Sequence, residues 1–278
     1  MSTPPRRYRY FRNTVVGVLA GTLWSLIGAL PVPAIDANTV APFPIGITAR
    51  WEPSGMAPPT PTALANYRQT YVTDFNGRVV PPGWDVFGGT PGGDPGGQFD
   101  AHHVVVTQGL LRLKVWRDPR YQNRWVTGGL CQCGRPMTYG AFFVRSRVTG
   151  VGPNTAELLW PRSNVWPPEI DFNEDLGQVN LTTATLHWTP GNQTEFRILR
   201  INMFKWHTWG VIWTPTSVTY VVDGHPWHEV SLAGTIPHIP MDLNFEQRTG
   251  CFQGRDCPTQ PSAVLIDWVA EYQPSATR

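Results

Sequence analysis

The stretch Trp209-Gly-Val-Ile-Trp213-Thr-Pro-Thr-Ser-Val218-Thr-Tyr-Val-Val222 contains two apolar runs separated by a polar turn. Within each run a large apolar side chain recurs at every second position, which is the period of a β-strand and not that of a helix. The polar residues Thr214–Ser217 lie between the runs. We therefore expect two strands joined by a turn.

The same period of two continues on both sides of this pair. Gln108-Gly109 is typical of a hairpin turn, and it lies between the expected strands Ala101–Thr107 and Leu110–Trp116. The remaining expected strands are Ala101–Thr107, Leu110–Trp116, Tyr139–Val148, Thr155–Trp160, Glu169–Glu174, Thr183–Trp188, Glu195–Ile201, Trp227–Val230, Met241–Phe245 and Ala263–Tyr272. About a dozen strands with glycine and proline turns, and almost no helix, predict an all-β sandwich.

The composition supports this fold class. Hydrophobic residues make up 41% of the 278 residues and charged residues only 15%, which excludes an intrinsically disordered chain. Thirteen tryptophans in a charge-poor chain suit a carbohydrate cleft, where flat rings stack on sugars. Without residues 1–34 the chain has 18 basic and 20 acidic residues, so we expect no nucleic-acid partner.

The first 66 residues differ from the rest. Arg6–Arg12 is basic, Thr14–Leu30 is uncharged, and Pro31–Ala34 is small and apolar. This order predicts that residues 1–34 are a signal peptide cleaved after Ala34, or else a retained N-terminal membrane anchor. Either alternative makes the protein secreted, or extracellular and attached to the cell wall or membrane. Residues 35–66 are rich in proline and lack apolar periodicity, which predicts an extended linker.

The four cysteines form two close pairs, Cys131-Gln-Cys133 and Cys251-x5-Cys257. Zinc is the competing interpretation, but these spacings match no common zinc site. We therefore expect disulfides, which suit an oxidising compartment. Three pairings are possible. Bonding Cys251 to Cys257 closes a short loop and leaves Cys131 and Cys133 bonded to each other or free.

One acidic segment stands out, Trp166-Pro-Pro-Glu169-Ile-Asp171-Phe-Asn-Glu174-Asp175. Four of the 20 acidic residues of the chain fall within residues 169–175. In a strand Glu169 and Asp171 point to the same face, whereas Glu174 would point to the other. A single-residue bulge at Phe172-Asn173 would return Glu174 to the common face.

Three neighbouring carboxyls repel each other, so at least one holds its proton near neutral pH. This arrangement supplies one ionised group and one proton donor, as glycosidic bond cleavage requires. An acidic strand edge exposed to solvent, or a calcium site, is the alternative. Aromatic residues surround the segment: we expect Trp160, Trp166 and Trp188 to stack on sugars, and His187 either to contact substrate or to pack as a structural residue.

Several motifs make the chain similar to glycoside hydrolase family 16, the laminarinase and lichenase family. The resemblance spans roughly residues 70–273. The matching stretches are Thr73-Asp-Phe-Asn-Gly77, Tyr139-Gly-Ala-Phe-Phe-Val-Arg145, Leu159-Trp-Pro161, Glu169-Ile-Asp-Phe-Asn-Glu174, Thr185-Leu-His-Trp188, Trp206–Pro215, Tyr220–Gly224 and Ile266-Asp-Trp-Val269 with Tyr272. One departure is Asn244-Phe-Glu-Gln-Arg248, which replaces a usual apolar, glycine-rich run.

The resemblance implies a curved, concanavalin-like jelly-roll whose concave cleft binds a polysaccharide, with residues 67–275 as the catalytic domain. It implies retaining endo-hydrolysis of a β-linked glycan, with β-1,3-glucan as the leading substrate. Glu169 would be the nucleophile, Glu174 the general acid/base, and Asp171 the residue assisting the nucleophile. We expect a monomer without an obligate protein partner or cofactor, apart from a possible structural calcium near Asp267. A wall-glycan transglycosylase and a non-catalytic glycan-binding module are the alternatives.

Overall fold

The computed structural model describes residues 41–189, 191–251 and 257–275. The expected signal peptide or anchor at residues 1–34 lies outside these ranges. Within them, none of the helices is long and apolar enough to cross a membrane.

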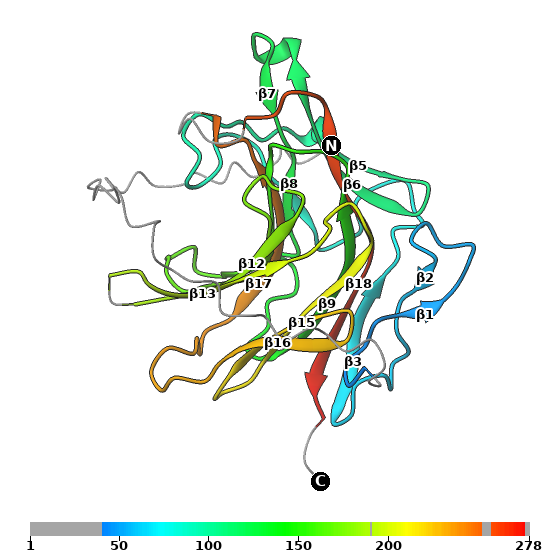
Figure 1. The fold of residues 1–278 in the computed structure, drawn as a ribbon, viewed down its shortest axis with the longest axis vertical. Helices are drawn as coiled ribbons and strands as arrows, with labels where there is room; N and C mark the ends of the chain where they lie inside the picture. Colours follow the sequence, from blue (N-terminus) through cyan, green and yellow to red (C-terminus); the bar gives the residue numbers. More distant parts are fainter. Residues whose placement is uncertain (1–40, 190, 252–256, 276–278) are drawn as a thin grey trace, which may run out of the picture.

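The chain forms two large antiparallel sheets (Figure 1). The seven-stranded sheet has, in spatial order, β13 (Gln193–Arg200), β12 (Leu181–Trp188), β11 (Glu169–Glu174), β10 (Asn154–Pro161), β17 (Met241–Arg248), β8 (Gly129–Cys131) and β4 (Asp85–Val86). The nine-stranded sheet runs through β16 (His225–Val230), β15 (Val218–Val222), β14 (His207–Trp213), β9 (Gly140–Val148), β18 (Ser262–Pro274), β6 (Leu110–Asp118) and β5 (Val104–Thr107), while β3 (Tyr67–Thr73) pairs with β18 and β7 (Arg124–Val126) with β6.

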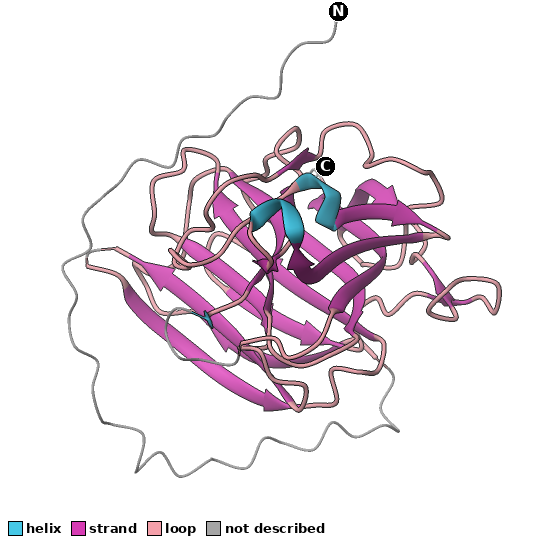
Figure 2. Cartoon of the chain, turned by 90° about the horizontal axis from the view of Figure 1, so that it is seen from above, coloured by secondary structure: helices cyan, strands magenta, loops and turns pink. Residues whose placement is uncertain are grey.

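The helical content of the described residues is small. Two 3₁₀ helices, η1 (Ala101–His103) and η2 (Pro119–Tyr121), lie near one another beside the strands (Figure 2). The hairpin expected at Trp209–Val222 is confirmed, because Trp213 pairs with Val218 in an antiparallel register. The predicted all-β sandwich is therefore confirmed.

The main core lies between the two sheets. Alternate residues of the seven-stranded sheet, such as Ile170, Phe172 and Leu186, are fully buried there. Trp209 and Trp213 of the nine-stranded sheet belong to the same cluster. Because strand side chains alternate, the residues between these apolar positions point away from the core. We call this opposite face of the seven-stranded sheet the site face.

One buried charge-bearing residue lies on the core side of the nine-stranded sheet. Glu271 of β18 pairs with the core residue Phe142 and is 0% exposed. Burial raises the pKa of Glu271 to about 8, and the charge of Arg135 opposes this rise only in part. The side chain therefore holds a proton at neutral pH.

The predicted linker is wrong for its described part, residues 41–66. This segment contains a two-stranded hairpin, β1 (Ile47–Thr48) with β2 (Met56–Ala57), and lies against the outer side of the nine-stranded sheet. Trp268 donates from Nε1 to the Met56 carbonyl oxygen at 3.0 Å, and the Tyr272 hydroxyl donates to the Thr60 carbonyl oxygen at 3.1 Å. The folded domain therefore begins before residue 67.

Candidate active site

The acidic strand β11 contains the predicted bulge. Asp171 pairs with Thr185 of β12, and Glu174 pairs with Thr183, so two residues of β11 face one residue of β12. Because Thr183 and Thr185 are two residues apart, they share a face, and so do Asp171 and Glu174. Glu169 pairs with His187 on that same face. The prediction that three carboxyls share one side of β11 is confirmed.

Glu169 is held by a neighbouring aromatic residue. The indole Nε1 of Trp166 donates a hydrogen bond to Glu169 Oε2 at 2.6 Å. Burial raises the pKa of Glu169 well above its ordinary value, the negative charge of Asp171 raises it further, and the charge of Arg248 and the indole bond oppose these effects. Trp166 thus stabilises the charged form of Glu169, the form that a nucleophile needs.

Asp171 lies between the two glutamates and contacts His187. His187 Nε2 is 3.4 Å from Asp171 Oδ2, and its Nδ1 is 2.9 Å from Asn192 Oδ1. One ligand-type atom from each of Glu169, Asp171 and His187 lies within 4.8 Å of the others. Burial lowers the pKa of His187, but the hydrogen bond and charge of Asp171, the Asn192 bond and the charge of Glu174 together outweigh it, and the net pKa is raised. His187 therefore tends to carry positive charge beside two carboxyls.

Glu174 is fixed by two donors. Asn154 Nδ2 donates to Glu174 Oε1 at 2.7 Å, and Arg248 Nη2 donates to the same oxygen at 2.9 Å. Burial raises the pKa of Glu174 and the charge of Asp171 raises it further, while the charge of Arg248 opposes both. The net pKa is raised, which suits a group that must deliver a proton near neutral pH.

Arg248 also contacts a second carboxylate. Its Nε lies 3.1 Å from Glu246 Oε1, so one guanidinium bridges Glu246 and Glu174. The Asn244–Arg248 stretch departs from the family pattern in the sequence, but its residues were not among those expected at the site. The alternation of Asp242, Asn244, Glu246 and Arg248 along β17 is a period-two polar pattern that indicates a shared face.

The structure brings three of the four predicted sugar-binding residues to the site face. Trp160 pairs with Asp242 and is partly exposed, as is Trp166, whose side chain is 41% exposed. The rings of Trp166 and His187 lie 5.6 Å apart. Trp188 is different: it follows His187 directly in β12, points to the other face and packs against the main core. The structure therefore does not place Trp188 with the others.

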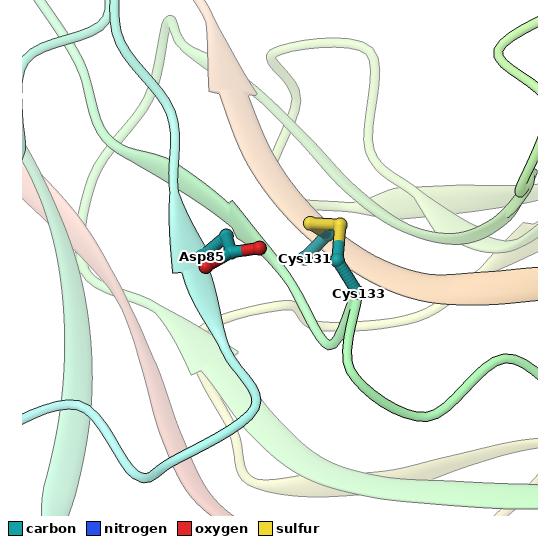
Figure 3. A group of neighbouring side chains, drawn as sticks. All are labelled: Asp85, Cys131 and Cys133. Carbon is teal, nitrogen blue, oxygen red and sulfur yellow. A yellow bond between two sulfur atoms is a disulfide. The ribbon is translucent and has the colours of Figure 1, made fainter. Parts of the chain in front are cut away.

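The cysteines form two disulfides, Cys131–Cys133 and Cys251–Cys257. Of the three possible pairings, the structure has the one in which Cys251 bonds to Cys257 and Cys131 bonds to Cys133. Figure 3 shows Asp85 beside the Cys131–Cys133 bond; these three residues resemble a metal-ligand group by distance alone. Both sulfurs are used in the disulfide, so neither is a thiolate available to zinc.

Asp267, near which a structural calcium ion was considered from the sequence, is a fully buried carboxylate. Asp267 Oδ2 accepts a hydrogen bond from Ser54 N at 3.1 Å. The described residues place no cluster of three acidic, histidine or cysteine side chains around it. Arg145 is buried nearby, and its positive charge acts on Asp267. The other oxygen of Asp267, Oδ1, is buried without a hydrogen-bond partner among the described residues, so the calcium ion stays a prediction.

The site and the fold together define a class of protein. Two glutamates and an aspartate on one face of a β-sandwich, flanked by partly exposed tryptophans, are typical of a polysaccharide-cleaving enzyme. Residues 97–270 match the family model of glycosyl hydrolases family 16. The chain belongs to this family.

Individual relatives agree with this assignment. Endo-1,3-1,4-beta-glycanase ExsH of Rhizobium meliloti (strain 1021) is 31% identical over 148 residues, which is 49% of this chain and 30% of that protein. SCLam, a non-specific endo-beta-1,3(4)-glucanase, superposes with a TM-score of 0.67 at 21% identity, over 82% of this chain and 97% of SCLam. The laminarinase from Rhodothermus marinus gives 0.67 at 20% identity, over 74% and 97%. These structures share the fold.

Proposed function

We propose that this protein is a retaining endo-glycosidase that hydrolyses a β-linked polysaccharide, with β-1,3-glucan as its main substrate. The observation that carries the proposal is the bulge in β11, which places Glu169, Asp171 and Glu174 on one face. The names of the family relatives, endo-glucanases and laminarinases, support the choice of glucan.

In the first step, a Glu169 carboxylate oxygen attacks the anomeric carbon, and the bond to the leaving sugar oxygen breaks. Glu174 gives its proton to that oxygen, so the leaving chain departs as an alcohol. Asp171 lies between the two and helps to position Glu169 and His187. The products of this step are a covalent glycosyl ester on Glu169 and an ionised Glu174.

In the second step, ionised Glu174 takes a proton from water, and the water oxygen attacks the anomeric carbon. The ester bond breaks, Glu169 is restored as a carboxylate, and Glu174 is protonated again. Two inversions give net retention of configuration. Arg248 contributes by holding Glu174 Oε1 in place and by stabilising the ionised form that exists between the two steps.

Trp160 and Trp166 support substrate binding in this proposal, because their partly exposed rings border the carboxyls. We further propose that the protein acts as a monomer outside the cytoplasm. The two disulfides support an oxidising compartment.

The test measures reducing ends released from laminarin, lichenan, agarose and carrageenan. We expect cleavage of laminarin and its loss by several orders of magnitude in Glu169→Ala. Azide should partly rescue that variant, since a small anion fits the vacated space and attacks the anomeric carbon, which yields a glycosyl azide of inverted configuration. If the wild-type protein binds laminarin but releases reducing ends from none of the four glycans, the hydrolase proposal is wrong.

A further inference from the structure

A second groove lies away from the carboxyl cluster. It has a volume of about 970 Å³ and is bordered by the β1–β2 loop, the loop after β3, and the β5–β6 turn. The β1–β2 hairpin packs on the outer side of the nine-stranded sheet, where the Met56 carbonyl oxygen accepts the hydrogen bond from Trp268 Nε1. The site face belongs to the other sheet. The groove is therefore separate from the proposed active site.

Trp51 forms one wall of this groove and is 82% exposed, more than any other large hydrophobic side chain in the described residues. Its backbone is well anchored. Ala49 N donates to the Gly55 carbonyl oxygen at 2.9 Å, Glu52 N donates to the Ala49 carbonyl oxygen at 3.1 Å, and Ser54 N donates to Asp267. A fixed loop thus presents an indole ring that packs on little of the protein itself.

The floor of the groove depends on a glycine. Gly109 has φ +69°, and a Cβ placed there would lie 3.2 Å from Asn76 Oδ1 and 3.2 Å from Pro53 Cγ. The absence of a side chain keeps the floor open beside Asn76. Asn76 itself is oriented by a 2.7 Å bond from its Nδ2 to Asp74 Oδ2. Its amide oxygen thus faces the region between Gly109 and Pro53.

The chemistry of the lining favours an uncharged ligand with many hydroxyls. Glu52 and Arg78 bring opposite charges to the groove, and Asn76 and Gln108 bring amides. Such a lining does not concentrate charge of one sign, as an anion or cation site would. One exposed aromatic ring with polar donors and acceptors around it is instead suited to a sugar, which has an apolar face and a rim of hydroxyls.

We propose that this groove is a second glycan-binding site, in which Trp51 stacks on a sugar unit of a neutral β-glucan while Glu52, Asn76, Arg78 and Gln108 bind its hydroxyls. The choice of β-glucan rests on the proposed function. The site holds the enzyme on an insoluble polysaccharide while the carboxyl cluster acts on another stretch of chain. The second site does not affect the cleavage of a short soluble substrate, because such a substrate occupies only the active site.

The experiment combines Trp51→Ala with two substrates. In a Glu169→Gln background, which binds without cleavage, we expect Trp51→Ala to weaken adsorption to insoluble β-1,3-glucan about 3- to 10-fold, the range of one lost aromatic contact. In the otherwise wild-type enzyme, kcat/KM on a short soluble oligosaccharide should stay unchanged. Leu232→Ala removes an exposed apolar side chain that does not line the groove and is the matched control.

Trp51→Phe keeps a ring and should retain most of the adsorption. Unchanged adsorption in Trp51→Ala would overturn the second site, and so would an equal loss on the soluble oligosaccharide. These results are distinguishable from failure of the proposed function. Adsorption is measured on the inactive Glu169→Gln protein, so a loss caused by Trp51→Ala would support the groove even if the wild-type protein cleaved no glycan.

Discussion

Arg248 Nη2 lies 2.9 Å from Glu174 Oε1, the same oxygen that Asn154 contacts at 2.7 Å. A guanidinium beside a proposed general acid presents a conflict, since its charge favours the ionised form that has already lost the proton. Burial and Asp171 act in the opposite direction, and the net pKa of Glu174 remains raised. The balance among these groups determines the pH range in which the site can work.

Replacing Arg248 with Met tests this balance. Removing its charge raises the pKa of both Glu169 and Glu174, because Arg248 opposes the rise at each. We expect both limbs of the pH profile of kcat/KM to move to higher pH, by about one unit. Arg162→Met is the control, because Arg162 pairs with Asp242 on the same sheet. Limbs that coincide with the wild-type profile would contradict this role of Arg248.

Replacing Trp166 with Phe keeps an aromatic ring but removes the donor to Glu169 Oε2. The charged form of Glu169 then loses a stabilising bond, so its pKa rises. We expect the acidic limb of the kcat/KM profile to move upward and kcat to fall about 10-fold or more. Trp188→Phe, on the core side of β12, should leave that limb in place. Equal effects of the two variants would show that the indole bond is not the cause.

Replacing Glu174 with Ala separates the two chemical steps. A substrate with an activated aryl leaving group needs little protonation, so we expect its first step to survive while laminarin hydrolysis is lost. Burst kinetics on the aryl substrate measure this, because the glycosyl ester on Glu169 should then form faster than it breaks down. A variant that cleaves laminarin at the wild-type rate would exclude Glu174 as the acid/base.

Replacing Glu271 with Gln tests the buried carboxyl in the nine-stranded sheet. Its folded-state pKa of about 8 lies above the ordinary value of 4.5, so the folded protein retains a proton that the unfolded chain releases between these pH values. Glu271 therefore makes the free energy of unfolding fall as pH rises from about 4.5 to 8. Gln resembles the protonated form and should remove this fall.

Urea unfolding at pH 5 and pH 9 measures the effect. We expect Glu271→Gln to be more stable than wild type at pH 9, by a few kcal/mol in order of magnitude, and similar to it at pH 5. The exposed Glu229→Gln is the control. If the free energy of unfolding changed by the same amount between pH 5 and pH 9 in wild type and Glu271→Gln, the raised pKa of Glu271 would be contradicted.

Thiol alkylation in denaturant tests the two disulfides against a zinc site. We expect no labelled cysteine before reduction and four labelled cysteines after it, since Cys131–Cys133 and Cys251–Cys257 are both bonded. Cysteines bound to zinc would instead be labelled without a reductant once a chelator is present. Intact mass spectrometry distinguishes these results.

The sequence allowed the fold and the acidic strand to be predicted, because both depend on local side-chain alternation. The bulge was predictable for the same reason. Glu174 stands an odd number of residues from Glu169, so a regular strand would point it to the opposite face, and one extra residue returns it to the face of Glu169. Trp188 was placed wrongly although the same rule applied, since adjacent residues His187 and Trp188 cannot share a face of a regular strand.

The remaining differences depend on contacts between distant parts of the chain. Arg248 reaches Glu174 only because β17 lies beside β10, and alternation within β17 does not specify its neighbour. Residues 41–66 show no strand period because backbone groups make many of their contacts. Ser54 and Asp267, for example, are 213 residues apart in sequence. Proline content alone therefore suggested a linker where the chain is packed.

The central position of β18 has a consequence for the order in which the molecule can assemble. This last strand pairs with β3, β6 and β9, three strands that otherwise have no hydrogen-bonding partner on that side. A growing polypeptide cannot complete the nine-stranded sheet until residues 262–274, which form β18, have been synthesised. Until then, β6 and β9 each present an unpaired edge, the feature that makes incomplete chains prone to aggregate. Folding should therefore be slow and dominated by long-range contacts.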